Sequence, residues 1–138
     1  MNNRTFPAHG GLKITREGQL LLIYAQGPGN TEMVLKYQKD LHDYRIKMSA
    51  SPWASLTIFS GEPLLPPEAS KLMVDSIKQA QGLNLVANAI IFDNVQCKTI
   101  SQQFWTDILQ QTTLKHGFFD DEQKAKAWLR EEVANTQG

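Results

Sequence analysis

The chain has 138 residues, which suits one domain. Its single cysteine excludes an intramolecular disulfide and a thiolate zinc cluster, and we therefore expect the protein in a reducing cytoplasm. Its 14 basic and 14 acidic residues cancel, so no overall field attracts nucleic acid, an anionic membrane or a charged substrate. No apolar run approaches the roughly 20 residues of a membrane-spanning helix. Residues 1–10 lack the apolar core of a secretory signal. We expect residues 1–10 and 135–138 to be flexible tails.

The first part of the chain predicts a β-hairpin followed by a helix. Residues 12–15 and 19–26 are rich in strand formers and flank a short loop that contains glycine. The segment Gly27-Pro28-Gly29-Asn30 ends the second strand. We interpret it as a tight turn, with Asn30 as the N-cap of a helix over 31–48, because it lacks the lysine and the length of a phosphate-binding loop.

A third strand and a second helix come next. Residues 55–60 alternate in polarity and end at a glycine, which is typical of a short strand. Pro66 and Pro67 are tolerated only in the first turn of a helix, and the apolar periodicity after them ends at Gly82. The spacing therefore predicts a helix between these prolines and Gly82.

Residues 85–92 form an apolar run rich in β-branched and aromatic types, and they predict a strand that is buried on both faces. Asn88 is the one polar residue in the run. Strict alternation would place Val86 and Asn88 on one face, and Leu85 and Ala87 on the other. We expect this strand to lie at the centre of the sheet.

The last part of the chain predicts a helix, a short edge strand and a final helix. Thr99 and Gln102 match a capping box at the start of the first of these helices. Residues 114–119 fit the edge strand, and Asp120 with Gln123 match a second capping box. The order of elements is therefore that of a mostly parallel sheet with crossover helices.

The predicted order of strands and helices also indicates whether two copies of the chain associate. Right-handed crossovers that never reverse would place all the helices on one face of the sheet. The final helix would bury Trp128 and Leu129 there and leave Lys126 in solvent. The second face of the sheet would then need a cover, which predicts a homodimer.

The most motif-like residues lie at the end of the chain, in Phe118-Phe119-Asp120-Asp121, Ala125 and Trp128-Leu129. They resemble the closing helix of bacterial SpoIIAA-like proteins, a family related in fold to the STAS domains of anti-sigma factor antagonists. The resemblance implies an α/β fold: a right-handed β-α superhelix with a five-stranded mixed sheet, an N-terminal hairpin and four helices. It also implies a non-enzymatic cytoplasmic interaction module with a regulatory role and a protein partner.

The phosphorylation switch of the STAS group is not expected here. In its switching members, a phosphorylatable serine lies in an Asp-Ser-Ser-Gly turn that opens the helix after the third strand. The corresponding turn here reads Leu65-Pro66-Pro67-Glu68, and the nearest hydroxyl is that of Ser70, one turn inside. The prolines remove two N–H donors that would hold a phosphate, and Glu68 repels it.

Polar side chains follow the ends of two neighbouring strands: Ser60 and Glu62 after one, and Asp93, Asn94 and Cys97 after the other. Because α/β sheets bind ligands at the carboxyl ends of their strands, we predict a ligand site from these five residues. The simpler interpretation is that Asp93 and Asn94 form a turn and that Cys97 is a buried thiol.

Three functions remain open from the sequence. The interaction module comes first, and a carrier of a small apolar ligand, similar to CRAL-TRIO domains, is the alternative, although so short a chain has little room for their large cavity. An enzyme with a site near Asp93 is third. His9, His42 and His116 lack the spacing of a metal site, so we predict no metal, no cofactor and no catalytic residue.

Overall fold

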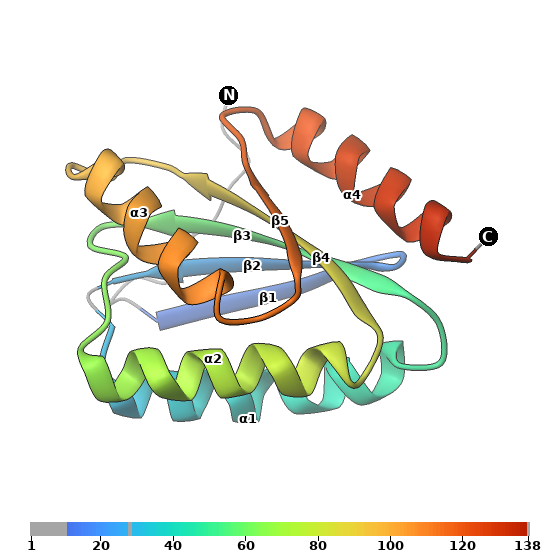
Figure 1. The fold of residues 1–138 in the computed structure, drawn as a ribbon, viewed down its shortest axis with the longest axis horizontal. Helices are drawn as coiled ribbons and strands as arrows, with labels where there is room; N and C mark the ends of the chain where they lie inside the picture. Colours follow the sequence, from blue (N-terminus) through green and yellow to red (C-terminus); the bar gives the residue numbers. More distant parts are fainter. Residues whose placement is uncertain (1–10, 28, 138) are drawn as a thin grey trace.

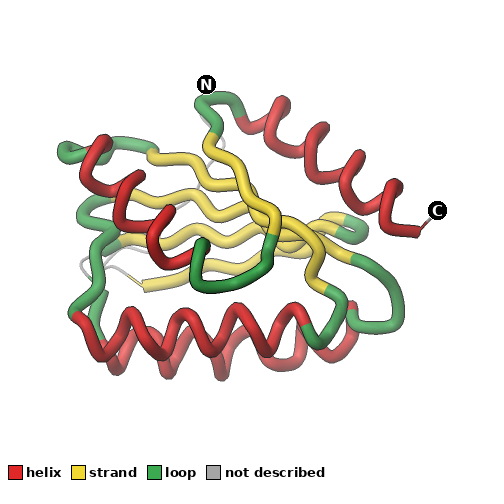
Figure 2. Tube along the Cα trace, in the orientation of Figure 1, coloured by secondary structure: helices red, strands yellow, loops and turns green. Residues whose placement is uncertain are grey.

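A five-stranded mixed sheet forms the middle layer of the protein, with helices on both of its faces (Figures 1 and 2). The computed structural model describes residues 11–27 and 29–137, so the tail predicted at residues 1–10, with His9, lies outside them. The strands are β1 (Gly11–Glu17), β2 (Leu20–Gln26), β3 (Trp53–Ser60), β4 (Leu85–Phe92) and β5 (Lys115–Phe118). The helices are α1 (Thr31–Met48), α2 (Pro67–Gln81), α3 (Lys98–Leu109) and α4 (Glu122–Gln137).

The strands lie across the sheet in chain order, with β1 antiparallel to β2 and all other neighbours parallel. This is the predicted fold class, including the N-terminal hairpin and the four helices. No helix in the described part of the chain is both long and apolar enough to cross a membrane.

The helices are divided between the two faces of the sheet. α1, α2 and α3 connect parallel strands and share one hydrophobic core with the sheet face beneath them, as crossovers of one hand require. α4 follows the edge strand and returns across the opposite face, where it contacts β2, β3 and β4 (Figure 1). The expectation that all the helices lie on one face is therefore wrong, and the predicted homodimer loses the argument on which it was based.

Both faces of the central strands are buried because each face has its own helices. In β2, Leu21 and Ile23 pack with α1, α2 and α3, whereas Leu20 and Leu22 pack with α4. All eight residues of β3 are buried. The prediction that the 85–92 segment is an interior strand covered on both sides is confirmed. Its expected place at the centre is taken by β3, since β4 lies between β3 and the edge strand β5.

A β-bulge at the start of β4 changes the predicted facing of two residues. Trp53 pairs with Leu85 while its neighbour Ala54 pairs with Ala87, so Val86 is the extra residue. Leu85 therefore packs with the α1–α3 core and Val86 with the α4 core. Strict alternation predicts the reverse for both residues, because a bulge cannot be read from the polarity pattern.

The start of α1 is as predicted, but the starts of the last two helices differ. Asn30 Oδ1 accepts a hydrogen bond from the Met33 backbone N–H at 2.8 Å. Thr99 lies inside α3, which begins one residue earlier with Cys97 as N-cap and no side-chain cap bond, so the predicted capping box does not form. The start of α4 differs because Asp120 and Asp121 have different bonding partners from those predicted.

The N-cap of α4 is Asp121 instead of Asp120. Asp121 Oδ1 accepts from the backbone N–H of Gln123 at 2.9 Å. The Asp120 carboxylate instead pairs with Lys98 Nζ at 2.8 Å, and this bond lowers the pKa of Asp120. α4 then continues to Gln137, through residues 135–137 that were expected in a tail.

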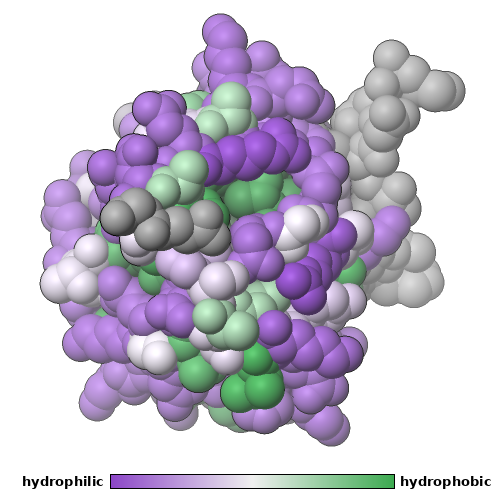
Figure 3. All heavy atoms as spheres, turned by 90° about the vertical axis from the view of Figure 1, so that its right-hand side faces the viewer, coloured by the Kyte–Doolittle hydropathy of each residue, from purple (hydrophilic) through white to green (hydrophobic). Residues whose placement is uncertain are grey.

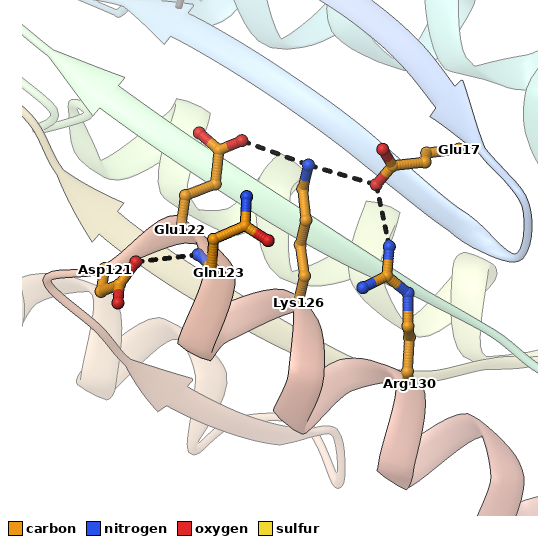
Figure 4. A network of polar contacts seen from close by, with 6 residues as sticks. All are labelled: Glu17, Asp121, Glu122, Gln123, Lys126 and Arg130. Atoms are coloured by element: carbon orange, nitrogen blue, oxygen red, sulfur yellow. Dashed lines mark hydrogen bonds and ion pairs between the residues drawn. The ribbon is translucent and has the colours of Figure 1, made fainter. Parts of the chain in front are cut away.

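Lys126 holds α4 to the β1–β2 hairpin (Figure 4). It is only 7% exposed, and its Nζ lies 3.1 Å from Glu17 Oε2 and 3.2 Å from Glu122 Oε2. Arg130 Nη2 lies 3.2 Å from the same oxygen of Glu17. The expectation that Lys126 faces solvent is wrong, because the end of the hairpin lies over this side of α4.

Replacing Lys126 tests this attachment. Burial lowers the pKa of Lys126, but its bonds to Glu17 and Glu122 outweigh burial and raise the pKa above the ordinary 10.5. Because folding raises the pKa of Lys126, the protonated lysine stabilises the fold fully at pH values below the pKa it has in the unfolded chain. This stabilisation is lost as the pH rises through the pKa of Lys126 in the folded protein. We expect Lys126→Ala to lower the free energy of unfolding by about 1–2 kcal/mol at neutral pH, because two carboxylates lose their shared cation.

Urea unfolding near pH 8 and near pH 11 measures this loss, which should shrink at the higher pH. Lys124→Ala is the matched control, because Lys124 is exposed two residues earlier on the same helix. Equal, small losses for the two variants at both pH values would contradict the attachment.

Candidate functional site

The carboxyl ends of β2, β3 and β4 meet at one edge of the sheet, where the sequence predicts a ligand site. The Asp93 backbone N–H donates to the Phe59 carbonyl at 2.7 Å, and the Gly27 N–H donates to the Ser60 carbonyl at 3.0 Å. The backbones of the predicted site residues Ser60 and Asp93 are thus held beside neighbouring strands.

The side chains of the predicted site differ in their exposure to solvent. Ser60 is buried, Glu62 is exposed, and Asn94 is exposed in a left-handed turn with φ 59°. Cys97 is exposed at the start of α3, so its interpretation as a buried thiol is wrong. Within the described ranges, no group of three His, Cys, Asp or Glu side chains could hold a metal ion. A ligand role for these five residues remains a prediction.

Gly27 brings the loop after β2 against the loop after β3. A Cβ atom at this position would lie 1.9 Å from the Glu62 carbonyl oxygen, so a residue with a side chain cannot fit without moving the backbone. Gly61, with φ 76°, supplies the other half of this contact. The Gly27 N–H is already bonded to Ser60 and is not free for a phosphate.

A cavity of about 90 Å³ lies inside the protein between the sheet and the helices α1 and α2. Its lining reaches the carboxyl edge of the sheet at Gly27, Gly29 and Glu62. Most of the remaining lining is apolar and includes Leu21, Ile23, Val34, Leu41, Met73 and Ile77. Of the five residues in the predicted site, Glu62 is the one that lines this cavity.

A buried polar cluster from β3 and β4 lines the sheet side of the cavity. Asn88 Nδ2 donates to Ser55 Oγ at 2.8 Å, to Thr57 Oγ1 at 3.2 Å and to the Ser55 carbonyl at 3.2 Å. Asn88 is the residue that interrupts the apolar run of β4 in the sequence. That interruption is the sequence signal for a polar group inside this core.

On the helix side, Arg45 and Tyr37 of α1 line the cavity. Arg45 is 6% exposed, and its Cζ lies 5.7 Å from the centre of the Tyr37 ring. Burial raises the pKa of the Tyr37 hydroxyl, although the neighbouring guanidinium acts to lower it. Two buried atoms of lining residues, Arg45 Nε and Gln26 Oε1, have no hydrogen-bond partner within residues 11–27 and 29–137.

Sequence reasoning did not identify Arg45, although a signal was present. Arg45 lies four residues after Leu41 and three before Met48, which is the spacing of the buried face of α1. A cation at such a position is unusual and marks a buried site that needs a partner. The site that the structure supports is this cavity: an apolar pocket with a few polar groups directed into it, as small-molecule sites are built.

The contact at Gly27 yields a prediction about the cavity edge. We expect Gly27→Ala to lower the free energy of unfolding by more than about 2 kcal/mol, because the added methyl group meets the backbone of the neighbouring loop. Gly82→Ala is the control, since Gly82 has an ordinary helical φ of −65°. Similar melting temperatures for the two variants would show that these loops are not in contact.

No protein-family model matches the chain, and no curated protein matches it. Its structure is similar to the crystal structure of an uncharacterized protein of the DUF3478 family, with a SpoIIAA-like fold, from Shewanella loihica PV-4. The two chains are 19% identical, the match covers 94% of this chain and 98% of the other, and the TM-score is 0.59. The SpoIIAA-like fold predicted from the sequence is therefore confirmed.

Proposed function

We propose that the protein is a non-enzymatic binding module that holds a small, mainly apolar molecule in the cavity between the sheet and the helices α1 and α2. The sequence made this the alternative to a protein-interaction module. The cavity of about 90 Å³ is the observation that supports it, because a fully closed core would have left no room for a ligand. At roughly 10–15 Å³ for each water-sized group, the space suits a ligand of about six to nine non-hydrogen atoms.

Two tryptophan side chains in the wall of this cavity are held by hydrogen bonds to the backbone. The indole N–H of Trp53 donates to the Leu83 carbonyl, and that of Trp105 donates to the Pro63 carbonyl, both at 2.7 Å. Both rings line the cavity. Side chains held in this way favour binding, because little side-chain entropy is lost when the ligand is enclosed.

An enzyme near Asp93 has less support than a binding module. A nucleophilic cysteine needs a base beside it. Cys97 is exposed at the start of α3, and in the described part of the chain no histidine is hydrogen-bonded to it. An exposed free thiol supports the proposed location in the reducing cytoplasm.

The binding proposal predicts that 1-hexanol, which has seven non-hydrogen atoms, enters the cavity. Titration with 1-hexanol, followed by ¹H–¹⁵N NMR, should shift the indole N–H resonances of Trp53 and Trp105, because both rings line the cavity. We expect Val34→Phe to abolish these shifts, since Val34 is a fully buried lining residue and the larger ring fills the space.

The matched control is Val86→Phe. Val86 packs with the α4 core on the other face of the sheet, so the same added atoms leave the cavity unchanged. Thermal unfolding of each variant establishes that it folds. If 1-hexanol at millimolar concentration leaves both indole resonances of the wild type unmoved, the cavity does not bind apolar molecules and the proposal fails.

As a second candidate function, we propose that the protein is an interaction module that binds a second copy of its own chain. The sequence predicts both the interaction module and the homodimer. Leu35 and Ile46 of α1 support it: they are 50% and 49% exposed, and their spacing of eleven residues places them on the same side of the helix. The face in Figure 3 is mainly hydrophilic, with its hydrophobic side chains in separate small groups. Because of the exposed Leu35 and Ile46, the outer side of α1 is the surface to test for the protein partner.

Sedimentation equilibrium at micromolar concentration tests this second candidate. We expect a dimer mass for the wild type and a monomer mass for the double variant Leu35→Glu, Ile46→Glu, because four buried carboxylates would oppose the interface. Ile100→Glu is the control, since Ile100 is 62% exposed but lies on α3. A wild type that sediments as a monomer would remove the homodimer.

A further inference from the structure

Arg45 is a buried cation on the cavity side of α1. Its side chain is on the inward face of α1 and is 6% exposed. No carboxylate in the described ranges forms an ion pair with it. A buried, unpaired charge costs several kcal/mol, so a residue of this kind is expected to have a partner in the functional state.

Arg45 lines the cavity and also borders a more open pocket between α1 and α2. The guanidinium carbon lies 5.7 Å from the ring centre of Tyr37, so the side chain runs back along α1 toward the N-terminal end of the helix. Arg45 Nε is buried and finds no acceptor among the described residues. Tyr37 does not neutralise the charge, because burial raises the pKa of its hydroxyl and keeps the phenol neutral.

The sheet side of the same cavity also offers hydrogen-bond donors. The hydroxyl oxygens of Ser55 and Thr57 both accept from Asn88 Nδ2, which leaves the proton of each hydroxyl to donate elsewhere. Both residues are buried and line the cavity. With Arg45 they supply donors for a ligand group that accepts hydrogen bonds, on a lining that also holds the acceptor oxygens of Gln26 and Glu62.

Among the described residues that line the cavity, Glu62 is the acidic one. Glu62 lies at the carboxyl edge of the sheet, where it is exposed to water. Solvent screens its charge there, whereas the buried Arg45 is screened much less. Of these two charged groups of the lining, Arg45 is therefore the one shielded from solvent.

We propose that Arg45 is the counter-ion for the carboxylate of a small organic acid whose apolar body fills the cavity. The inference rests on the proposed binding function and names its ligand class: aliphatic or aromatic monocarboxylic acids of about six to nine non-hydrogen atoms. A carboxylate accepts hydrogen bonds without donating any, and a guanidinium is the side chain that matches its geometry best. The ligand thereby neutralises the buried charge that the protein leaves unpaired.

A comparison of hexanoate with 1-hexanol tests this proposal, because the two share an alkyl chain and differ in charge. We expect hexanoate to bind the wild-type protein at least about tenfold more tightly than 1-hexanol near pH 7, as measured by NMR titration of the Trp53 and Trp105 indole resonances. Binding of 1-hexanol without any preference for hexanoate would overturn the role of Arg45 and leave the proposed function standing. Binding of neither compound would overturn both.

Variants of Arg45 give a second, independent measurement. Arg45→Met keeps most of the side-chain volume and removes the charge, so the preference for hexanoate should disappear while 1-hexanol binding changes little. Arg45→Gln, which keeps a neutral N–H donor, serves if the methionine variant does not fold. Lys47→Met is the control for net charge, since Lys47 is exposed two residues further along α1. A preference for hexanoate that survives in Arg45→Met or Arg45→Gln would overturn the proposal.

Discussion

The whole architecture depends on the burial of both faces of the three central strands. β2, β3 and β4 carry large apolar side chains on alternate sides, and each face must be covered to remove them from water. Crossovers of one hand place α1, α2 and α3 on the first face. The second face is left to the last element of the chain, and α4 supplies the cover by passing back over the sheet.

The two faces are packed differently, and the candidate site lies on one of them. Under α4, the sheet presents aliphatic residues and alanines, and the small Ala125 of the helix allows close approach. Under α1 and α2, the same strands present Ser55, Thr57 and Asn88, which are polar and bond to one another. The cavity of about 90 Å³ lies on this face, and the polar side chains of Ser55, Thr57 and Asn88 belong to its lining.

The contacts that hold α4 and the groups that line the cavity lie on opposite faces of the sheet. α4 is attached by its apolar residues and by the ion pairs of Lys126, on the face away from the cavity. The cavity is bounded by α1, α2 and the loops at the carboxyl edge, where Gly27 allows two backbones to meet. Substitutions in the cavity can therefore be separated experimentally from losses of α4 docking.

The sequence by itself determined the elements, their order and the fold class, because apolar periodicity, prolines, glycines and the Asn30 cap are local signals. Residues 31–48 and 85–92 coincide with α1 and β4 for this reason. Only the tertiary structure decided what depends on distant residues: the return of α4, the burial of Lys126 by Glu17, the bulge at Val86 and the meeting of Arg45 with Asn88 around one cavity. These features arise between segments far apart in the chain, and no local pattern encodes which segments will meet.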